Sequence, residues 1–473
     1  MGVQTVDGRG TAGRGPAVAG FAPWPPQGGA KERGRALREK APREAHAHLT
    51  VTADRPGVVE AVELANLGRL ADLVPIRIGR MAASPFAFLR GSAGLMAHDL
   101  ATTSASGVTA QLCGDAHAAN FGLYGDARGH LVMDINDFDE TVPGPWEWDL
   151  KRLAASLVLA GRQAGADERI CREAAADASA SYRRTMRRLA KLPALDAWNA
   201  VTDEQLVSFT DSHDLGEVLA GVSAKALRNT SARFAAKATV RTEDGRWRFT
   251  AAPPVLSEVP DADAAAVSAS LGEYLETVPA ELHPLLARYS IQDVAFRIVG
   301  TGSVGTRSYV VLLTDRREEP LVLQVKEARP SVLLPHLARA GFEPAAPITH
   351  EGRRVVLGQK RMQVVSDVLM GWTTVDGLPY QVRQFRNRKG SVDPAALRPA
   401  LLDDYARLTG ALLARAHGHT AEAGVIAGYC GKGEELDTAI AAFAVAYADR
   451  SEADHAELVA AVRSGRLPAE TGI

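Results

Sequence analysis

Apolar residues recur at three- and four-residue spacing over much of the chain, which predicts amphipathic helices. Ser84 followed by Pro85 is typical of a helix N-terminus, because serine accepts a hydrogen bond from the first turn and proline suits the first helical position. The predicted helices cover 58–74, 85–101, about 149–165, 167–191, most of 192–290, and two or three stretches of 396–464.

Two regions have the short β-branched runs and turn residues that predict strands. The first is a strand at 108–112, followed by a loop and a hairpin over 121–135 that turns on GDARG. A smaller hairpin is expected at Asp244-Gly245. The second region begins near 291 and predicts strands in DVAFRIVG, RSYVVLLT and PLVLQVKEA, a helix at 331–341, and a strand pair in RRVVLGQKRMQVV and LPYQVRQFR.

These periods predict an α+β fold with two β-containing regions set among helices. Residues 1–35 hold nine glycines and four prolines, which predict a flexible tail because such a segment buries too little to offset its ordering entropy. The expected parts are a tail (1–45), a helical region with the first loop and hairpin (46–290), a β-rich region (291–394) and a helical return (395–473).

The composition argues against several classes of protein. Lys and Arg total 54 against 56 Asp and Glu, a net charge of −2, which argues against a strongly basic nucleic-acid-binding protein. Three cysteines in 473 residues do not make a disulfide framework and no C-x-x-C pair suggests zinc, so we expect a reducing cytoplasm. No apolar run reaches the roughly 18 residues of a membrane span. The N-terminus lacks the apolar core of a secretory signal.

Three oxygen-bearing side chains come from the first loop and its hairpin. Asp115 follows the predicted strand, Asn120 lies five residues later, and Asp137 follows the hairpin. Mg²⁺ prefers oxygen ligands and is usually held by one or two carboxylates plus substrate phosphates, so Asn120 and Asp137 are candidate ligands. Asp115 could orient a hydroxyl nucleophile and take its proton. Each residue alone is more simply a turn residue, but their order matches the phosphoryl-transfer template.

The segment GTGSVG at 300–305 has the pattern G-x-G-x-x-G, which two unrelated kinds of nucleotide site use. A dinucleotide fold needs a helix directly after the glycines, whereas the continuation TRSYVVLL predicts a strand. A glycine-rich turn over phosphates therefore fits better, and a glycine hairpin without a ligand is the alternative. The residues of that turn would be Gly300, Gly302, Ser303 and Gly305.

A single lysine, Lys326, stands late in the apolar strand LVLQVKEA. The simpler interpretation is that its ammonium reaches the surface. The functional interpretation is a lysine held inside a cleft to bind phosphates, about twenty residues after the glycine-rich turn, as the third strand of a kinase requires.

The stretches CGDAHAAN, DINDFDE and GPWEWDL, with the hairpin between the first two, resemble the catalytic core of aminoglycoside-phosphotransferase-like kinases. That pattern runs His-Gly-Asp-x-x-x-x-Asn, hairpin, Asp, and a further Asp-Leu that begins a helix. The resemblance implies that Asp115 is the catalytic aspartate and that Asn120 and Asp137 hold magnesium. It also implies that Asp149 braces the loop.

Two details depart from that pattern or leave a choice. Asp134 and Asp139 compete with Asp137 for the metal role; Asp137 is preferred because it directly precedes a phenylalanine and stands twelve residues before Asp149. Cys113 stands where the pattern has histidine, and we expect it to pack beneath the loop.

More widely, the chain resembles the bacterial family called domain of unknown function 2252, which is thought to share the protein-kinase-like fold. Ordinary kinases have the glycine-rich loop and lysine before the catalytic loop, whereas Asp115 precedes both here. We therefore expect a circularly permuted, two-lobed kinase-like fold. The matching stretches are RIGRMAASPFAFLRG, CGDAHAANFG, DINDFDETVPGPWEWDLKRLAAS, VGTGSVGTRSY, LQVKEA, GQKRMQ and IAGYCG.

Three assignments follow from order along the chain. The GQKRMQ stretch at 358–363 could supply the main-chain edge that reads adenine. An acidic partner for the strand lysine is not fixed: Glu327 points to the opposite face of a regular strand, and Glu343 and Glu351 are candidates. Candidates for contacting substrate anions are Arg80, Arg90 and Arg307, although bracing roles are simpler.

The resemblance implies an ATP- and Mg²⁺-dependent phosphotransferase that acts on a hydroxyl of a small molecule. Lys326 and the loop 300–305 would hold ATP, and helices in 45–105 and 192–290 are candidates for the acceptor pocket. The alternatives are a kinase-fold enzyme that transfers AMP and a non-catalytic nucleotide-binding scaffold. Neither a nucleic acid nor a membrane is an expected partner.

Overall fold

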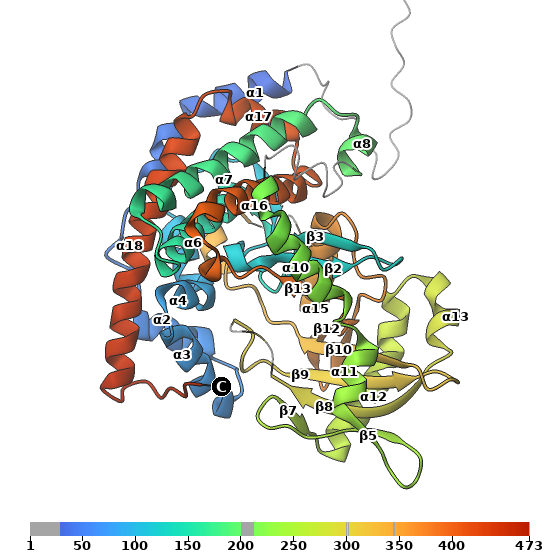
Figure 1. Ribbon diagram of the computed structural model, residues 1–473. Helices are drawn as coiled ribbons and strands as arrows, with labels where there is room; N and C mark the ends of the chain where they lie inside the picture. The colour runs from blue at the N-terminus through green and yellow to red at the C-terminus, as the bar shows by residue number, and fades with distance from the viewer. Residues whose placement is uncertain (1–28, 200–211, 299, 301, 344–345, 473) are drawn as a thin grey trace, which may run out of the picture.

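The computed structural model describes residues 29–472 apart from 200–211, 299, 301 and 344–345 (Figure 1). Helices make up 52% of the structure and strands 15%, in several antiparallel sheets, which confirms a mixed α+β protein. The helices are α1 Ala30–Ala36, α2 Val58–Asn66, α3 Val74–Ala82, α4 Pro85–Gly91, α5 Ala93–Leu100, α6 Glu147–Gln163, α7 Glu168–Leu189, α8 Ala194–Trp198, α10 Gly216–Leu227, α11 Ser231–Ala238, α12 Asp261–Thr277, α13 His283–Leu286, α14 Leu334–Arg339, α15 Glu351–Met362, α16 Leu402–Gly418, α17 Ala423–Cys430 and α18 Glu435–Arg463.

The strands fall into four sheets. The largest has six antiparallel strands in the order β11-β12-β10-β9-β8-β7; the others are β13-β2-β3, β1-β4 and the hairpin β5-β6. The strands are β1 Thr109–Leu112, β2 Phe121–Gly125, β3 Leu131–Ile135, β4 Val142–Pro145, β5 Thr239–Arg241, β6 Trp247–Phe249, β7 Leu256–Glu258, β8 Ser290–Arg297, β9 Ser308–Thr314, β10 Pro320–Glu327, β11 Gly371–Val375, β12 Leu378–Gln384 and β13 Gly390–Ser391.

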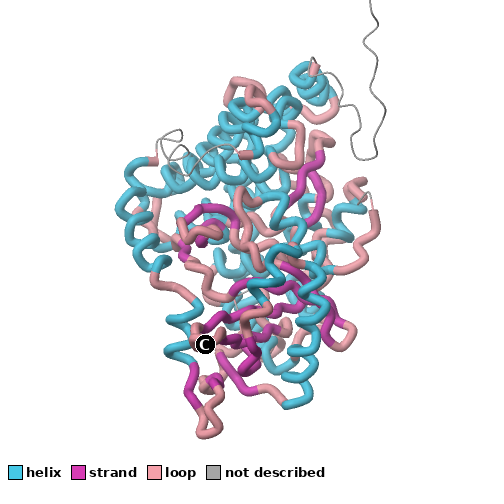
Figure 2. Tube along the Cα trace, turned by 90° about the vertical axis from the view of Figure 1, so that its right-hand side faces the viewer, coloured by secondary structure: helices cyan, strands magenta, loops and turns pink. Residues whose placement is uncertain are grey.

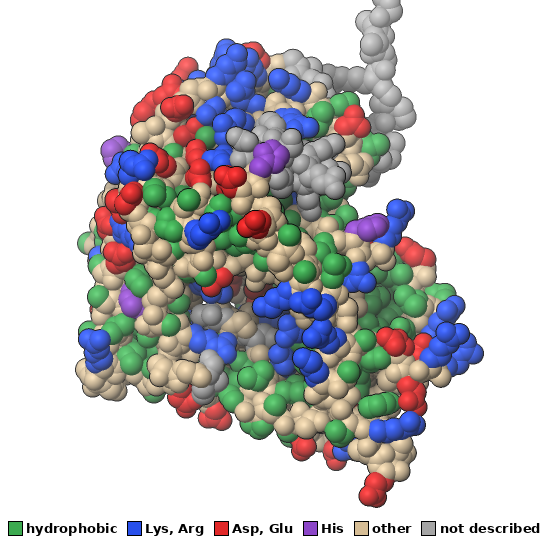
Figure 3. All heavy atoms as spheres, in the orientation of Figure 1, with side chains coloured by type: hydrophobic (Ala, Val, Ile, Leu, Met, Phe, Trp, Pro, Cys, Tyr) green, Lys and Arg blue, Asp and Glu red, His purple; other side chains and the backbone are tan. Residues whose placement is uncertain are grey.

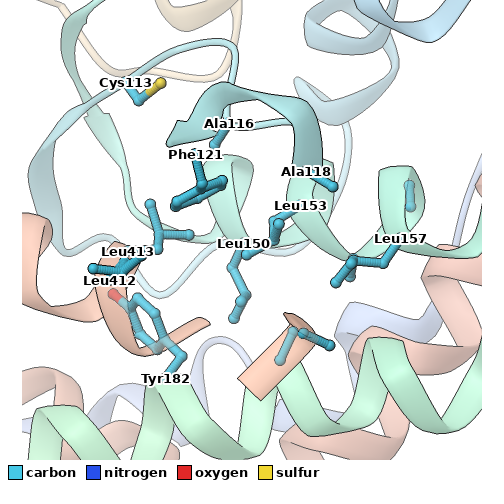
Figure 4. Close-up of a cluster of buried hydrophobic side chains, with 14 of the residues drawn as sticks. Cys113, Ala116, Ala118, Phe121, Leu150, Leu153, Leu157, Tyr182, Leu412 and Leu413 are labelled. Carbon is cyan, nitrogen blue, oxygen red and sulfur yellow. The ribbon is translucent and has the colours of Figure 1, made fainter. Parts of the chain in front are cut away.

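The main core lies between α6, α7 and α16, beneath the loop 113–120, which we call the Asp115 loop (Figure 4). Leu150, Leu153 and Leu157 of α6 pack with Tyr182 of α7 and with Leu412 of α16, and all five are buried. The Asp115 loop is therefore seated on a rigid apolar base. No helix in the described part of the chain is both long and apolar enough to cross a membrane.

The six-stranded sheet is apolar on one face and carries the strand lysine on the other. Leu321, Leu323 and Val325 of β10 join the cluster that α12 covers. Strand residues alternate between faces, so Lys326 points with Gln324 to the opposite side. Figure 2 shows the helical part above and the strands of this sheet below.

The N-terminal helices join the two parts. In Figure 1, α2, α3 and α4 (blue) lie beside the long C-terminal α18 (red), and their buried side chains share a cluster with Leu458 of α18. The α2–α3 connection reaches the glycine-rich loop, where the Leu70 N–H donates to the Gly305 carbonyl at 2.8 Å. The segment 58–74 was expected to be one helix. Instead α2 ends at Asn66, and Gly68, just beyond it, has a left-handed φ of 74°.

Most predicted elements are present, but besides the segment 58–74 three others differ. The helix expected over 85–101 is divided at Ser92 into α4 and α5. Ser84 caps α4 as predicted, accepting from the Ala87 N–H. Helix α1 begins at Ala30, inside the expected 1–45 tail, and the Arg33–Glu422 ion pair ties it to the start of α17; residues 1–28 lie outside the described part. Residues 351–362 form helix α15, not the predicted strand, and β12 pairs with β11 instead.

Candidate active site

The main chain of the Asp115 loop is held by Asp149, the third residue of α6. The Asp149 carboxylate accepts the N–H of Cys113 at 2.7 Å and the N–H of Gly114 at 3.0 Å, which confirms the bracing role. Gly114 has φ of 84°, and a Cβ there would lie 2.2 Å from the Glu140 carbonyl oxygen. Only glycine fits, because both the conformation and the close approach exclude a side chain.

Asp115 lies at the cavity wall with a cationic partner that the sequence analysis missed. Its Oδ1 accepts from Arg152 Nε at 2.6 Å, and Arg152 Nη2 lies 2.5 Å away. His117 Nε2 is 3.7 Å from the other carboxylate oxygen. Burial lowers the pKa of His117 to about 4, although Asp115 opposes the shift, so the ring is neutral near pH 7. The Asp115 carboxylate is thus oriented by Arg152 rather than free.

Asn120 joins the Asp115 loop to the segment after the hairpin. Its Nδ2 donates to the carbonyls of Asp115 at 3.1 Å and Asp137 at 3.0 Å. Both bonds use the amide nitrogen, so Oδ1 is the atom left to bind a cation. Burial, and then the neighbouring Asp139 carboxylate, raise the pKa of Asp137. A cation beside Asp137 would relieve that repulsion.

No group of three or more His, Cys, Asp or Glu residues with metal-binding geometry occurs in the described chain. This does not conflict with a magnesium role for Asn120 and Asp137, because Mg²⁺ is usually held by one or two protein oxygens together with substrate phosphates and water. The half-buried carboxylate of Asp137, which Asp139 repels, and the oxygen of Asn120 are the kinds of ligand that Mg²⁺ prefers.

Asp139 is the acidic partner of Lys326. Lys326, whose side chain is 2% exposed, forms an ion pair with Asp139 Oδ2. The same oxygen accepts from Ser303 Oγ at 2.9 Å, and Oδ1 accepts from Gln381 Nε2 at 2.9 Å. Burial alone would raise the pKa of Asp139, but the Lys326 ammonium and these hydrogen bonds lower it to about 2.

The candidate partners Glu343 and Glu351 do not pair with Lys326, and neither does its neighbour Glu327: Glu343 forms no ion pair in the described structure, and the other two bind other residues. Glu327 accepts from the Arg307 main chain at 2.9 Å and pairs with its guanidinium at 3.3 Å, so Arg307 has a bracing role. Glu351 pairs with Arg354 of its own helix. Neither carboxylate pairs with the strand lysine in the described structure. A partner 187 residues away in the chain, Asp139, has taken that place.

The glycine-rich loop is fixed from the side of the N-terminal helices. Gly300 and Gly305 have φ of 48° and 87°, which favour glycine. Arg69 Nη1 donates to the Val304 carbonyl at 2.7 Å, and Arg80 Nη1 donates to the Gly300 carbonyl at 2.5 Å. Arg80, a candidate for contacting anions, therefore also braces the loop.

One cavity of about 440 Å³ brings these groups together. In Figure 3 the surface is hollowed between the helical part and the sheet, and Lys and Arg side chains gather beside the hollow. Lys326 and Asn120 do not line the cavity but contact the carboxyl or main-chain groups of residues that do. The sequence-predicted residues in its wall are Asp115, Asp137, Gly302, Ser303 and the anion candidate Arg90, joined by Asp139.

Two expectations about the ligand pocket are wrong: the described helices of 192–290 do not line the cavity, and GQKRMQ does not present a main-chain edge. Residues of 45–105 form much of its wall, but no described residue of 192–290 lines it. GQKRMQ at 358–363 lies mostly within α15, whose main-chain groups are bonded within the helix, so it does not offer a free edge to a base. Residues near Asp137 that the sequence analysis missed are Arg383 and Lys389; burial, and then Arg383, lower the pKa of Lys389 to about 7.

Other candidate side chains have structural partners. Asp134 is fully buried and pairs with Arg415 at 3.1 Å, so it is not a free competitor for the metal role. His417 Nε2 lies 3.2 Å from Asp149 Oδ2 and helps to position this carboxylate, which in turn holds the Asp115 loop. Cys113 is buried beneath the loop as expected, and burial raises its pKa.

Comparison with known proteins identifies one family. The model of a family described as "Uncharacterized protein conserved in bacteria (DUF2252)" matches residues 69–461. No curated protein and no solved structure is significantly similar to the chain. The matched range includes every candidate residue from the Asp115 loop to Lys326. The chain therefore belongs to this conserved bacterial family, DUF2252.

Proposed function

We propose that this protein is an ATP- and Mg²⁺-dependent phosphotransferase that acts on a hydroxyl of a small molecule in the cytoplasm. One observation carries the proposal: Asp139 contacts both Lys326 of β10 and Ser303 of the glycine-rich loop, directly beside Asp137 and the Asp115 cavity. In kinases, a strand lysine, a glycine-rich loop and an aspartate beyond a hairpin meet in the same way around the nucleotide phosphates.

The order of the strands supports a circularly permuted kinase-like fold. β8, β9 and β10 are consecutive antiparallel neighbours, the glycine-rich loop joins the first two, and Lys326 lies on the third. That is the relation that the kinase template requires between its loop and its lysine. After β12 the chain returns to the helical part, where β13 pairs with β2 of the hairpin. The catalytic loop then precedes the sheet in sequence but adjoins it in space.

Magnesium, when bound with ATP, would neutralise charge on the phosphates as the phosphoryl group is transferred. Asn120 Oδ1 and the Asp137 carboxylate would hold it. The Asn120 hydrogen bonds do not use these oxygens, and the Asp137 carboxylate accepts the Asp139 N–H at 3.3 Å but forms no ion pair in the described chain. Asp139 would keep Lys326 oriented toward the phosphates until the nucleotide binds.

Asp115 would bind the acceptor hydroxyl and accept its proton. Arg152 fixes the carboxylate through Oδ1, which leaves Oδ2 toward the cavity and His117. Positioning and electrostatic stabilisation would supply most of the rate, because phosphoryl transfer needs little covalent chemistry from the protein. A cavity of about 440 Å³ is the size of a small-molecule site.

One observation favours the non-catalytic alternative. The sheet face that carries Lys326 is covered farther along by α11 and β6, where Phe234 and Phe249 pack with Val322 and Phe385. A base stacked on that part of the face would have to displace these side chains. A scaffold that uses the fold without ATP would not require such a rearrangement.

The products of a reaction with ATP test the proposal. The full chain is incubated with Mg·ATP and a mixture of hydroxyl-bearing metabolites, with Asp115→Asn as the matched control. Release of ADP and a phosphorylated product by the native protein alone supports the proposal. Release of pyrophosphate with an AMP-modified product would replace it by AMP transfer, and no turnover by either protein would favour the scaffold.

A further inference from the structure

The cavity has a second half that the phosphotransfer groups do not use. Four arginines line it, and none of them forms an ion pair within the described part of the chain. We call them the arginine group: Arg69, Arg77, Arg90 and Arg329. By contrast, the carboxylates Asp115, Asp139 and Glu327 in the same wall each pair with another cation.

Arg77 is the most buried member, with 2% of the residue exposed. Its Nη1 donates to Asn66 Oδ1 at 2.9 Å and its Nη2 to the Gly91 carbonyl at 2.7 Å, and its buried Nε has no partner. Burial, and then the charges of Arg69 and Arg329, lower the pKa of Arg77 to about 9. A buried guanidinium with only neutral partners is costly unless a counter-charge arrives.

The other three arginines also have neutral partners. Arg69 donates to the carbonyls of Ala65 and Val304, and Arg329 donates to the Leu67 carbonyl. Arg90 lies over the Phe86 ring at 5.9 Å, and its buried Nε has no partner.

Glu140 faces the same cavity, but its carboxylate accepts the Val332 N–H at 2.7 Å and forms no ion pair with the arginine group. The positive charge of this half is therefore not neutralised by direct pairing, as it would be in a purely structural cluster.

The walls beside the arginine group are apolar. They come from α2, α3, α4 and α5 and from the segment after β10, and include Val62, Met81, Phe88, Leu95 and Val332. A ligand that fits here needs a nonpolar body as well as an anionic group, because these walls offer few hydrogen bonds.

We propose that the arginine group binds the oxyanion, a phosphate or a carboxylate, of an amphipathic acceptor whose nonpolar body lies against α2–α5 and whose hydroxyl reaches Asp115. This assignment rests on the proposed function, because it takes Asp115 as the residue that receives the hydroxyl. Arginine suits the role, since its planar fork binds oxyanions through two parallel hydrogen bonds.

The phosphates of ATP are the other source of an oxyanion in this cavity. The acceptor is favoured because Lys326 already offers a cation on the nucleotide side of Asp139, and because phosphates alone would leave the apolar walls unused. The two sources differ in one measurable respect: an acceptor binds together with ATP, whereas a phosphate competitor excludes it.

Calorimetric titration with phenyl phosphate, phenol and inorganic phosphate tests the site. The native chain should bind phenyl phosphate at least about tenfold more tightly than either fragment, because only phenyl phosphate has both the oxyanion and the ring. The double variant Arg90→Gln/Arg329→Gln should weaken this binding by about tenfold or more. The exposed Arg241→Gln serves as the matched control and should leave it unchanged. Equal, weak binding of all three probes, or binding that the double variant retains, would overturn the inference.

Titration of Mg·ATP into the complex with phenyl phosphate separates the two sources. Unchanged ATP affinity, in the native chain and in the double variant, supports an acceptor site. Competition between the two ligands, or ATP binding weakened by the double variant, would overturn the acceptor assignment. If native protein binds phenyl phosphate but not Mg·ATP, the proposed function fails and the acceptor assignment fails with it; if it binds Mg·ATP but not phenyl phosphate, only this inference fails.

Discussion

Lys326 and Asp139 form an ion pair although 187 residues separate them in the chain. Lys326 belongs to the six-stranded sheet, and Asp139 follows the β2–β3 hairpin of the helical part. The pair therefore connects the two parts at the point where the glycine-rich loop also makes contact through Ser303.

The ion pair gives stability a defined dependence on pH. The pKa of Asp139 falls from its ordinary value of 3.8 to about 2 in the folded chain, so its contribution is present above pH 4 and is lost as the pH falls through about 2. A shift of this size is worth about 2 kcal/mol. Urea unfolding of the native chain and of Asp139→Asn should show a constant difference in free energy of unfolding between pH 7 and 5, and a smaller one at pH 3. A difference that does not change over this range would contradict the pairing.

The Asp115→Asn variant should lose activity but still bind the nucleotide. The amide keeps the size of the side chain but cannot accept a proton, so slow hydrolysis of ATP, with water as the acceptor, should fall by about 10²–10⁴-fold. The Kd for Mg·ATP should stay within about twofold, because Asp115 does not contact Lys326 or the glycine-rich loop in the described structure. Hydrolysis at the native rate would remove Asp115 from the mechanism.

Gly114→Ala should destabilise the protein far more than Gly245→Ala. Both glycines have a left-handed φ, 84° and 82°, so both variants carry the conformational cost of about 1 kcal/mol. Only the Cβ at position 114 would meet another group, the Glu140 carbonyl at 2.2 Å, whereas position 245 opens to free space. Urea unfolding of the two variants should therefore differ by more than about 2 kcal/mol. Similar costs would mean that the loop does not approach Glu140 so closely.

Asp149→Asn should also be destabilising, because an amide cannot accept both the Cys113 and the Gly114 N–H groups while facing His417. One buried donor would lose its partner, at a cost of about 1–3 kcal/mol. Asp449→Asn, at an exposed position, is the control and should change the free energy of unfolding by less than about 0.5 kcal/mol. Equal effects of the two substitutions in urea unfolding would argue against the bracing role.

Sequence patterns between neighbouring residues were enough to predict the Asp115 loop and the elements around it. The alternation in FGLY and HLVMDI with the GDARG turn predicted β2 and β3, and Ser84 before Pro85 predicted the start of α4. These features depend on neighbours in the sequence, and so does the position of Asp149 at the start of a helix. The same local evidence placed Asp115 and Asn120 in one loop.

The errors arose where distant contacts decide. Val355 and Val356 made the segment 353–365 look like a strand, but His350 caps α15 and the buried face of that helix packs against β12 and β11. β-branched residues are tolerated in a helix that tertiary packing stabilises. Asp139 as the partner of Lys326, and Arg152 as the partner of Asp115, could not be predicted, because no local pattern links residues that meet only after folding.

The most direct test of the account is calorimetric titration of Mg·ATP into the full chain, with Lys326→Ala and Asp137→Ala beside the surface control Arg241→Ala. The account predicts saturable binding that both site variants weaken by at least about tenfold and the control does not change. Thermal unfolding gives an independent readout, because ATP at 100 times its Kd adds about 2.7 kcal/mol of stability. No binding of Mg·ATP to the folded native chain, or binding that Lys326→Ala and Asp137→Ala leave intact, would contradict the account.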